Sequence, residues 1–212
     1  MKKLLTFLFI VAMATPSFAQ FETNRQRSRY NHNDTERYYG LRLGLNSSAL
    51  NSDKIDIDMN ARTGVSVGGV YGMQLANSTP IWLEAGLFYS EKGGKTQDDN
   101  GDQVKCRLTY FEVPVVIKYA FDIADDLYLQ PFLGGYVALG IAGKMKEYGT
   151  RFSDSSYNYV NRPDAGLRLG CGLEYQMVYA EVGFDFGLAN IGKDDFDSVR
   201  TQTLFINIGV NF

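Results

Sequence analysis

The 212-residue chain carries 21 Lys and Arg against 24 Asp and Glu, which gives a formal net charge of −3. This balance offers no support for nucleic-acid binding, which needs a concentrated basic face. The composition is too polar for a helical membrane protein, and with 14 Tyr, 14 Phe and 22 Gly it is too rich in these residues for an ordinary helical domain.

The first 19 residues have the pattern of a secretory signal peptide. A short positive region at residues 1–3 precedes an apolar stretch at residues 4–13, and residues 17–19 have the small-x-small pattern of a cleavage site. The apolar stretch is shorter than the roughly 20 residues of a membrane-spanning helix, which favours cleavage over an uncleaved anchor. We predict a signal peptide over residues 1–19, with the mature chain beginning at Gln20.

Residues 20–37 are rich in Arg, Asn, Gln and Ser and show no apolar periodicity. Such a composition cannot bury enough apolar surface to fold by itself. It predicts a flexible N-terminal segment in the periplasm, and the arginines leave binding to an anionic partner or to lipid headgroups as an alternative.

Eight runs in the rest of the chain alternate apolar with small or polar side chains, as β-strands do. They cover residues 38–46, 63–75, 81–92, 107–121, 127–144, 164–175, 178–188 and 201–212. The links between them alternate between short turns and long polar loops, which is typical of outer-membrane barrels. We therefore predict an all-β fold, an eight-stranded antiparallel up-and-down transmembrane β-barrel over residues 38–212, with both termini in the periplasm.

The alternation within each run predicts which face meets lipid. In the last run every second residue is apolar, namely Leu204, Ile206, Ile208, Val210 and Phe212, so these residues share one face of the strand. The outward-facing residues proposed for the centre of each run include no Asp, Glu, Lys or Arg, and a Lys or Arg on the lipid face would cost roughly 2–4 kcal/mol at the bilayer midplane. Aromatic residues at the run ends could form the two interfacial girdles, namely Tyr39, Phe121, Tyr175 and Phe212 on the turn side and Tyr89 and Phe111 on the loop side.

The charged residues within the strand centres share the opposite parity and are predicted to form a polar network in the lumen: Arg42, Glu84, Glu112, Lys118, Arg168, Glu174, Glu181 and Asp185. Eight strands leave interior room for side chains rather than a channel, so we expect ion pairs that plug the barrel. A polar path for a small solute is the alternative.

Particular partners follow from this arrangement. We expect Lys118 to meet Glu84 or a residue of the following run, and Arg42 to meet Glu181, Asp185 or the closing run. Pro114 cannot donate a ladder hydrogen bond and predicts a β-bulge.

A soluble barrel of the lipocalin kind is the structural competitor, with apolar residues inside and charges outside. Enzymatic chemistry has little support, because the only histidine, His32, lies before the first run and no Cys cluster accompanies it. We predict no enzymatic activity, no cofactor and no metal site. The Tyr-rich stretch at residues 148–159 is the best candidate for surface recognition.

The sequence from Tyr110 to Tyr119 contains the pattern Glu112-x-Pro114-x-x-x-Lys118-Tyr119. It resembles the fourth strand of the PorT-like outer-membrane β-barrel proteins of Gram-negative bacteria. The resemblance implies an integral outer-membrane barrel. The founding member of that family takes part in protein secretion, but most relatives have no assigned role, so this role is not carried over.

These observations together predict an integral protein of the cell outer membrane with a structural or surface-interaction role. Its expected partners are outer-membrane lipid and periplasmic or cell-surface proteins, and not nucleic acid. Two alternatives remain open at this point: a narrow porin-like conduit for small solutes, and an accessory component of a protein secretion machine.

Overall fold

The computed structural model describes residues 36–52, 59–76, 79–97, 103–147, 153–154, 161–191 and 199–212. The predicted signal peptide and the N-terminal segment as far as residue 35 lie outside these residues. No helix in the described part of the chain is long and apolar enough to cross a membrane.

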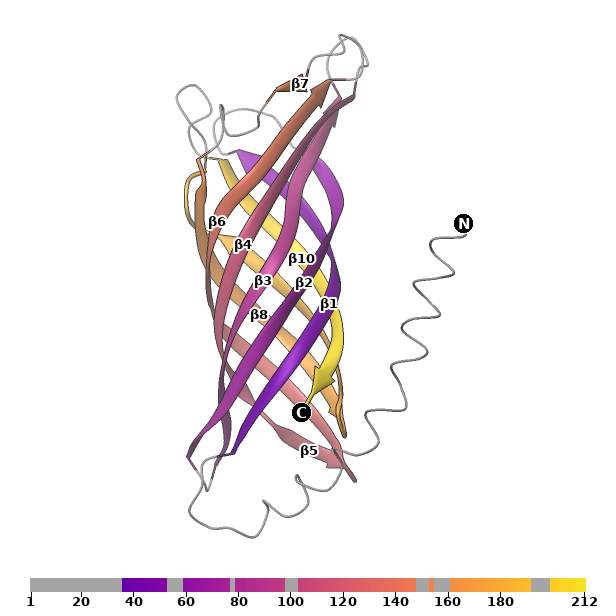
Figure 1. Cartoon of the computed structure of the whole chain (residues 1–212), viewed down its shortest axis with the longest axis vertical. Helices are drawn as coiled ribbons and strands as arrows, with labels where there is room; N and C mark the ends of the chain where they lie inside the picture. The colour runs from indigo at the N-terminus through magenta and orange to yellow at the C-terminus, as the bar shows by residue number, and fades with distance from the viewer. Residues whose placement is uncertain are drawn as a thin grey trace, which may run out of the picture.

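Eight long strands and two short ones make up the described fold (Figure 1). The long strands are β1 (Arg37–Ser52), β2 (Met59–Ala76), β3 (Thr79–Gln97), β4 (Gln103–Tyr119), β6 (Leu127–Glu147), β8 (Pro163–Tyr175), β9 (Val178–Gly187) and β10 (Val199–Asn211). The short strands are β5 (Phe121–Ala124) and β7 (Ser153–Asp154), and both pair with β6.

The long strands close into a barrel. Each pairs antiparallel with its neighbours in the order β4, β3, β2, β1, β10, β9, β8 and β6, and a further pairing of β4 with β6 completes the circle. The pairing of β1 with β10 continues as far as Phe212, which exchanges two backbone hydrogen bonds of 2.9 and 2.8 Å with Tyr39. The predicted eight-stranded antiparallel barrel is confirmed.

The strands run further than the predicted runs. A spanning strand needs about 9–11 residues, whereas β3, β4 and β6 have 19, 17 and 21. Much of what was expected to be loop therefore continues as paired strand beyond the loop end of the barrel (Figure 1). At the turn end the predicted fourth run is divided, because β4 ends at Tyr119 and β5 begins at Phe121.

The expected bulge at Pro114 is wrong. The register between β3 and β4 is the same on both sides of this residue, with Ala85 opposite Val115 and Phe88 opposite Glu112. Pro114 instead keeps its place opposite Tyr136 of β6. The missing N–H is thus accommodated without an extra residue in either strand.

The two faces of the wall differ in chemistry as the alternation predicted. Leu41, Leu43 and Leu45 of β1 are each 58% exposed on the outer face, while Arg42 between them is 2% exposed. The remaining long strands also turn apolar side chains outward, and aromatic Tyr39, Phe121, Tyr175 and Phe212 are exposed at the turn end. This rules out the soluble alternative, which needs the reverse arrangement.

Candidate functional site in the barrel interior

All eight residues predicted for the lumen are buried, with exposed fractions between 1% and 9%: Arg42, Glu84, Glu112, Lys118, Arg168, Glu174, Glu181 and Asp185. They come from β1, β3, β4, β8 and β9, and alternation along each strand turns them to the interior. A buried charge is costly unless it is paired and hydrogen-bonded, so the contacts of these residues decide what the interior can do.

Nearest the loops, four charged residues form a closed ring of alternating sign. Lys92 Nζ lies 2.6 Å from Glu112 Oε2 and 3.5 Å from Asp185 Oδ2. Arg168 donates to both oxygens of Asp185 at 2.7 Å and to Glu112. We call these four residues the loop-side ring. Because β3 and β9 lie on opposite sides of the barrel, the ring crosses the whole interior.

Closer to the turns, Glu84 is the centre of a second group. Its carboxylate accepts hydrogen bonds from Tyr38 Oη at 2.5 Å and Lys118 Nζ at 2.8 Å, and Arg42 Nη2 lies 3.6 Å away. Arg42 also lies over the ring of Tyr179, with its guanidinium carbon 4.0 Å from the centroid. The group therefore ties β1, β3, β4 and β9 together.

Tyr179 carries this second group across the interior. Its hydroxyl accepts a hydrogen bond from Lys118 at 2.8 Å and donates one to Glu181 at 3.0 Å. Asn207 of β10 donates to the other oxygen of Glu181 at 2.7 Å. We call Arg42, Glu84, Lys118, Tyr179 and Glu181 the turn-side cluster. Its two cations and two carboxylates balance.

An apolar layer separates the two charged groups. It consists of Val116, Phe132 and Phe205, all at most 5% exposed. The guanidinium of Arg168 lies 4.5 Å from the Phe205 ring centroid, and the ammonium of Lys118 lies 5.6 Å from that of Phe132. The interior is thus filled in layers, as expected for a barrel of eight strands.

Two further carboxylates lie at the ends of these layers and take neutral donors. Asp164 accepts hydrogen bonds from Thr201 at 2.8 Å and from Tyr136 at 3.4 Å. Toward the turns, Glu174 accepts 2.9 Å hydrogen bonds from Gln130 and Asn211.

Apolar side chains close the loop-side mouth above Asp164. They form one buried cluster of Leu108, Tyr110, Tyr136, Ala138 and Ile191. Ile191 belongs to the segment after β9, and its N–H donates to the carbonyl of Val199 at 2.9 Å. Ile191 therefore packs at the loop-side end of the lumen.

Sequence reasoning found some of these contacts and missed others. Lys118 meets Glu84, as expected, and Arg42 Nη1 reaches the carbonyl of Val210 on the closing strand at 3.3 Å. The charged partner of Arg42 is Glu84, not the expected Glu181 or Asp185. Lys92 was missed, although it shares the parity of Glu84, because it lies at the end of its predicted run.

Among the residues that the structure describes, no three His, Cys, Asp or Glu lie together as metal ligands would. His32 lies outside the described residues. The paired charges are instead suited to holding the strands together and filling the space between them.

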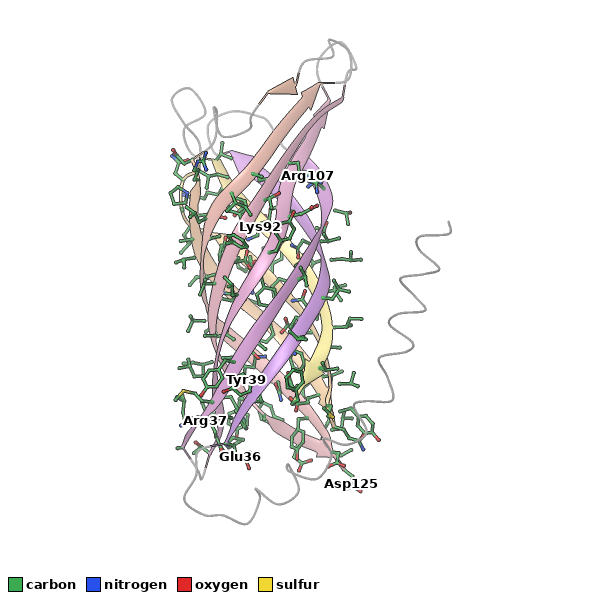
Figure 2. All side chains as sticks on the ribbon, viewed as in Figure 1. Glu36, Arg37, Tyr39, Lys92, Arg107 and Asp125 are labelled. Atoms are coloured by element: carbon green, nitrogen blue, oxygen red, sulfur yellow. The ribbon has the colours of Figure 1, made fainter. Side chains whose placement is uncertain are left out.

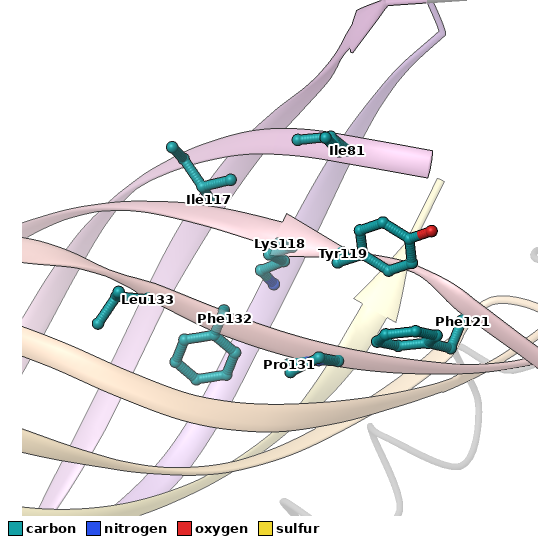
Figure 3. Close-up of a pocket in the computed structure, with 8 residues that line it drawn as sticks. All are labelled: Ile81, Ile117, Lys118, Tyr119, Phe121, Pro131, Phe132 and Leu133. Carbon is teal, nitrogen blue, oxygen red and sulfur yellow. The ribbon is translucent and has the colours of Figure 1, made fainter. Parts of the chain in front are cut away.

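A hollow of about 440 Å³ lies in the wall where β4 gives way to β5 (Figure 3). The β4–β6 ladder ends at the pair Lys118 and Phe132, and pairing resumes between Phe121 and Leu129. Pro131, between them, has no N–H to donate. The lining residues are Ile81, Ile117, Lys118, Tyr119, Phe121, Pro131, Phe132 and Leu133. This mostly apolar lining suits contact with lipid tails.

Comparison with known proteins agrees with this geometry. Residues 18–192 match the family model described as outer membrane protein beta-barrel domain. A comparison with curated proteins found no match.

Solved structures supply further likenesses. Neisserial surface protein A has 16% identity over 82% of this chain and 97% of its own, with a TM-score of 0.50. OprG from Pseudomonas aeruginosa has 9% identity over 85% and 98%, with a TM-score of 0.49. Ail, the attachment invasion locus protein of Yersinia pestis, has 16% identity over 84% and 99%, with a TM-score of 0.46. At 16% identity, the likeness to Neisserial surface protein A supports the fold alone.

Proposed function

The chain belongs to the outer membrane protein beta-barrel domain family, and from this we propose that it is an integral outer-membrane protein with a structural or surface-interaction role. In this proposal the lumen is closed, and what the protein does takes place at its exposed ends. The role is not enzymatic.

The loop-side ring is the observation that carries this proposal. It joins two cations and two carboxylates across the interior, with each charge in contact with two of opposite sign. A solute crossing the barrel would have to break these contacts and leave buried charges unpaired, which is strongly unfavourable. The apolar layer below the ring and the mouth cluster above it add two further obstructions.

The orientation belongs to the same proposal. Short turns face the periplasm together with both termini, and the long loops face outward, following the usual asymmetry of such barrels. Partners would then be lipid around the wall and cell-surface or periplasmic proteins at the two ends. The Tyr-rich stretch at residues 148–159 remains the candidate recognition loop, and most of it lies outside the described residues.

Within the family, the pattern from Glu112 to Tyr119 favours a place near the PorT-like proteins. In the described fold Glu112 belongs to the loop-side ring and Lys118 to the turn-side cluster. The pattern therefore has a structural use in plugging the lumen, which accounts for it without any role in secretion. Secretion would need partner proteins, and co-purification from outer-membrane extracts would identify them.

Conductance in planar bilayers tests the proposal. The wild-type protein is expected to give no steady ion current. A variant with all four ring residues changed to alanine, Lys92→Ala, Glu112→Ala, Arg168→Ala and Asp185→Ala, is expected to pass more current than the wild type, because it removes one of the three obstructions while the charge stays balanced.

Folding of both proteins is checked by heat-modifiable gel mobility, since a closed barrel runs faster before boiling. A variant with Arg37→Ala and Asp125→Ala, which are exposed and lie at the turn end (Figure 2), controls for charge change outside the lumen. Steady current through the folded wild-type protein would overturn the plugged lumen and establish the narrow conduit.

A further inference from the structure

A third group of charged residues lies on the outer face of the wall, close to the loop end. Arg107 of β4 donates a hydrogen bond to Oε1 of Glu91 on β3, and Arg62 Nη2 of β2 lies 3.8 Å from Oε2. The Tyr89 hydroxyl donates to Glu91 Oε1 at 3.4 Å. Glu91 has the parity of Tyr89 and of Leu87, which is 58% exposed, so its carboxylate belongs to the outer face.

Two side chains of this group are largely buried, and the third is exposed. The side chain of Glu91 is 9% exposed and that of Arg62 is 15% exposed, whereas that of Arg107 is 51% exposed. Arg107 lies toward the loop end of the barrel (Figure 2). Arg62 is further held by a 3.2 Å hydrogen bond from Nη1 to the carbonyl of Lys92. Two guanidiniums thus contact the one carboxylate of Glu91.

The height of the cluster places it at the membrane surface. Tyr89 and Phe111 lie opposite each other on β3 and β4, and aromatic residues of this kind mark the interface of a bilayer. Glu91 lies two residues nearer the loops, and because strands rise about 3.3 Å per residue and are tilted by about 35–45°, this offset is about 5 Å in height. The headgroup layer is roughly 5–7 Å thick on each side of the hydrocarbon, and both guanidiniums contact the Glu91 carboxylate, so they lie at about its level.

We propose that Arg62 and Arg107 bind the phosphate of a lipid headgroup in the leaflet on the loop side. The guanidinium fork matches the geometry of phosphate oxygens and binds them through charge-assisted hydrogen bonds. Basic sites near the membrane surface recognise anionic headgroups in this way. Glu91 holds both arginines in place before the ligand arrives, which reduces the entropy lost on binding.

The test uses the full mature chain in a neutral maltoside detergent. Short-chain phosphatidic acid is added, and bound lipid is counted by native mass spectrometry. Replacing one charged hydrogen-bond donor is expected to weaken binding about tenfold or more in the variants Arg62→Gln and Arg107→Gln. Arg37→Gln removes the same charge at the turn end, where Arg37 is exposed, and is expected to bind as the wild type does.

Two competitors separate the sources of the anion. Inorganic phosphate at the same concentration is expected to displace little lipid, because it lacks the acyl chains that lie against the wall. A short-chain fatty acid is expected to bind poorly, because it lacks phosphate. Equal binding by folded Arg107→Gln and wild type overturns the site, and equally strong binding of inorganic phosphate overturns the lipid headgroup as its ligand. Gel mobility before boiling establishes that each variant is folded.

Discussion

Arg168 and Asp185 lie directly opposite each other on β8 and β9 and form a two-point ion pair, with Nε to Oδ1 and Nη2 to Oδ2 both at 2.7 Å. The pair is buried, and the same guanidinium also reaches Glu112 on β4. One arginine therefore joins a neighbouring strand pair to β4, which lies on the other side of β6.

This position predicts a large effect for Arg168→Met. The substitution leaves Glu112 and Asp185 with only Lys92 between them, and removing one partner of a buried ion pair typically costs about 3–5 kcal/mol. We expect the free energy of unfolding in urea to fall by about that amount. Tryptophan fluorescence of the protein in lipid vesicles would follow the transition.

A double variant provides the control. Arg168→Met with Asp185→Leu removes one charge of each sign and leaves Lys92 paired with Glu112. Replacing a whole buried pair by apolar residues is often close to neutral, so most of the lost stability should return. If the double variant were as unstable as the single one, unpaired charge would not be the cause.

Tyr179→Phe tests the turn-side cluster. The change removes the hydroxyl that joins Lys118 to Glu181 and keeps the aromatic side chain that fills the same space. Leaving buried polar groups without a partner costs about 1–3 kcal/mol, and we expect that loss in the urea unfolding of the vesicle-bound protein. Tyr119→Phe is the matched control, because Tyr119 is 40% exposed on the outer face, and its effect should stay within about 0.5 kcal/mol. Equal effects of the two changes would mean that the hydrogen bonds of the Tyr179 hydroxyl do not stabilise the barrel.

The sequence was sufficient to predict closure, strand number and the face that each residue occupies, because alternation has a period of two and the lipid face tolerates no charge. It was not sufficient to predict which lumen charges meet. Arg42 and Glu84 lie on β1 and β3, which are separated by β2, so their contact depends on the stagger and tilt of the whole barrel. Alternation within one run carries no information on stagger.

The sequence was also insufficient to assign the residues at the ends of the strands. Lys92 and Asp164 both belong to the interior, yet Lys92 is the last residue of its predicted run and Asp164 the first of its own, and polar residues at such ends resemble loop. Pairing beyond the membrane extends β3 to Gln97 and β4 back to Gln103, and this extension is stabilised by neighbours rather than by local pattern. The same dependence on neighbours explains why Pro114 keeps its register without a bulge.

Leu43→Arg tests the lipid-facing assignment. Leu43 is 58% exposed near the middle of β1, where an arginine is expected to lower stability in vesicles by about 2–4 kcal/mol. Leu75→Arg places the same charge one residue before the turn end of β2, where Leu75 is 47% exposed, and near the interface its cost should be about 0–1 kcal/mol. Urea titrations of both variants provide the comparison. If the two positions responded alike, the depth assigned to β1 would be wrong.

Gly72→Ala and Gly69→Ala test how tightly the interior is filled. Gly72 lies opposite Tyr38 across β1 and β2, and a Cβ atom built there would come within 2.2 Å of the tyrosine ring. Tyr38 cannot easily withdraw, because its hydroxyl binds Glu84 at 2.5 Å and its ring packs on Trp82 with centroids 5.4 Å apart. Overpacking of this kind typically costs about 1–3 kcal/mol.

Gly69, three residues away on the same strand, has the outward parity, and a Cβ atom there would meet nothing closer than 3.7 Å. Gly69→Ala should therefore be neutral or slightly stabilising, since alanine loses less backbone entropy than glycine on folding. The heating temperature at which the fast-running gel band disappears would rank wild type, Gly69→Ala and Gly72→Ala in one experiment. A Gly72→Ala barrel as resistant to heat as Gly69→Ala would mean that the interior around Tyr38 has room to spare, which would weaken the case for a plugged lumen.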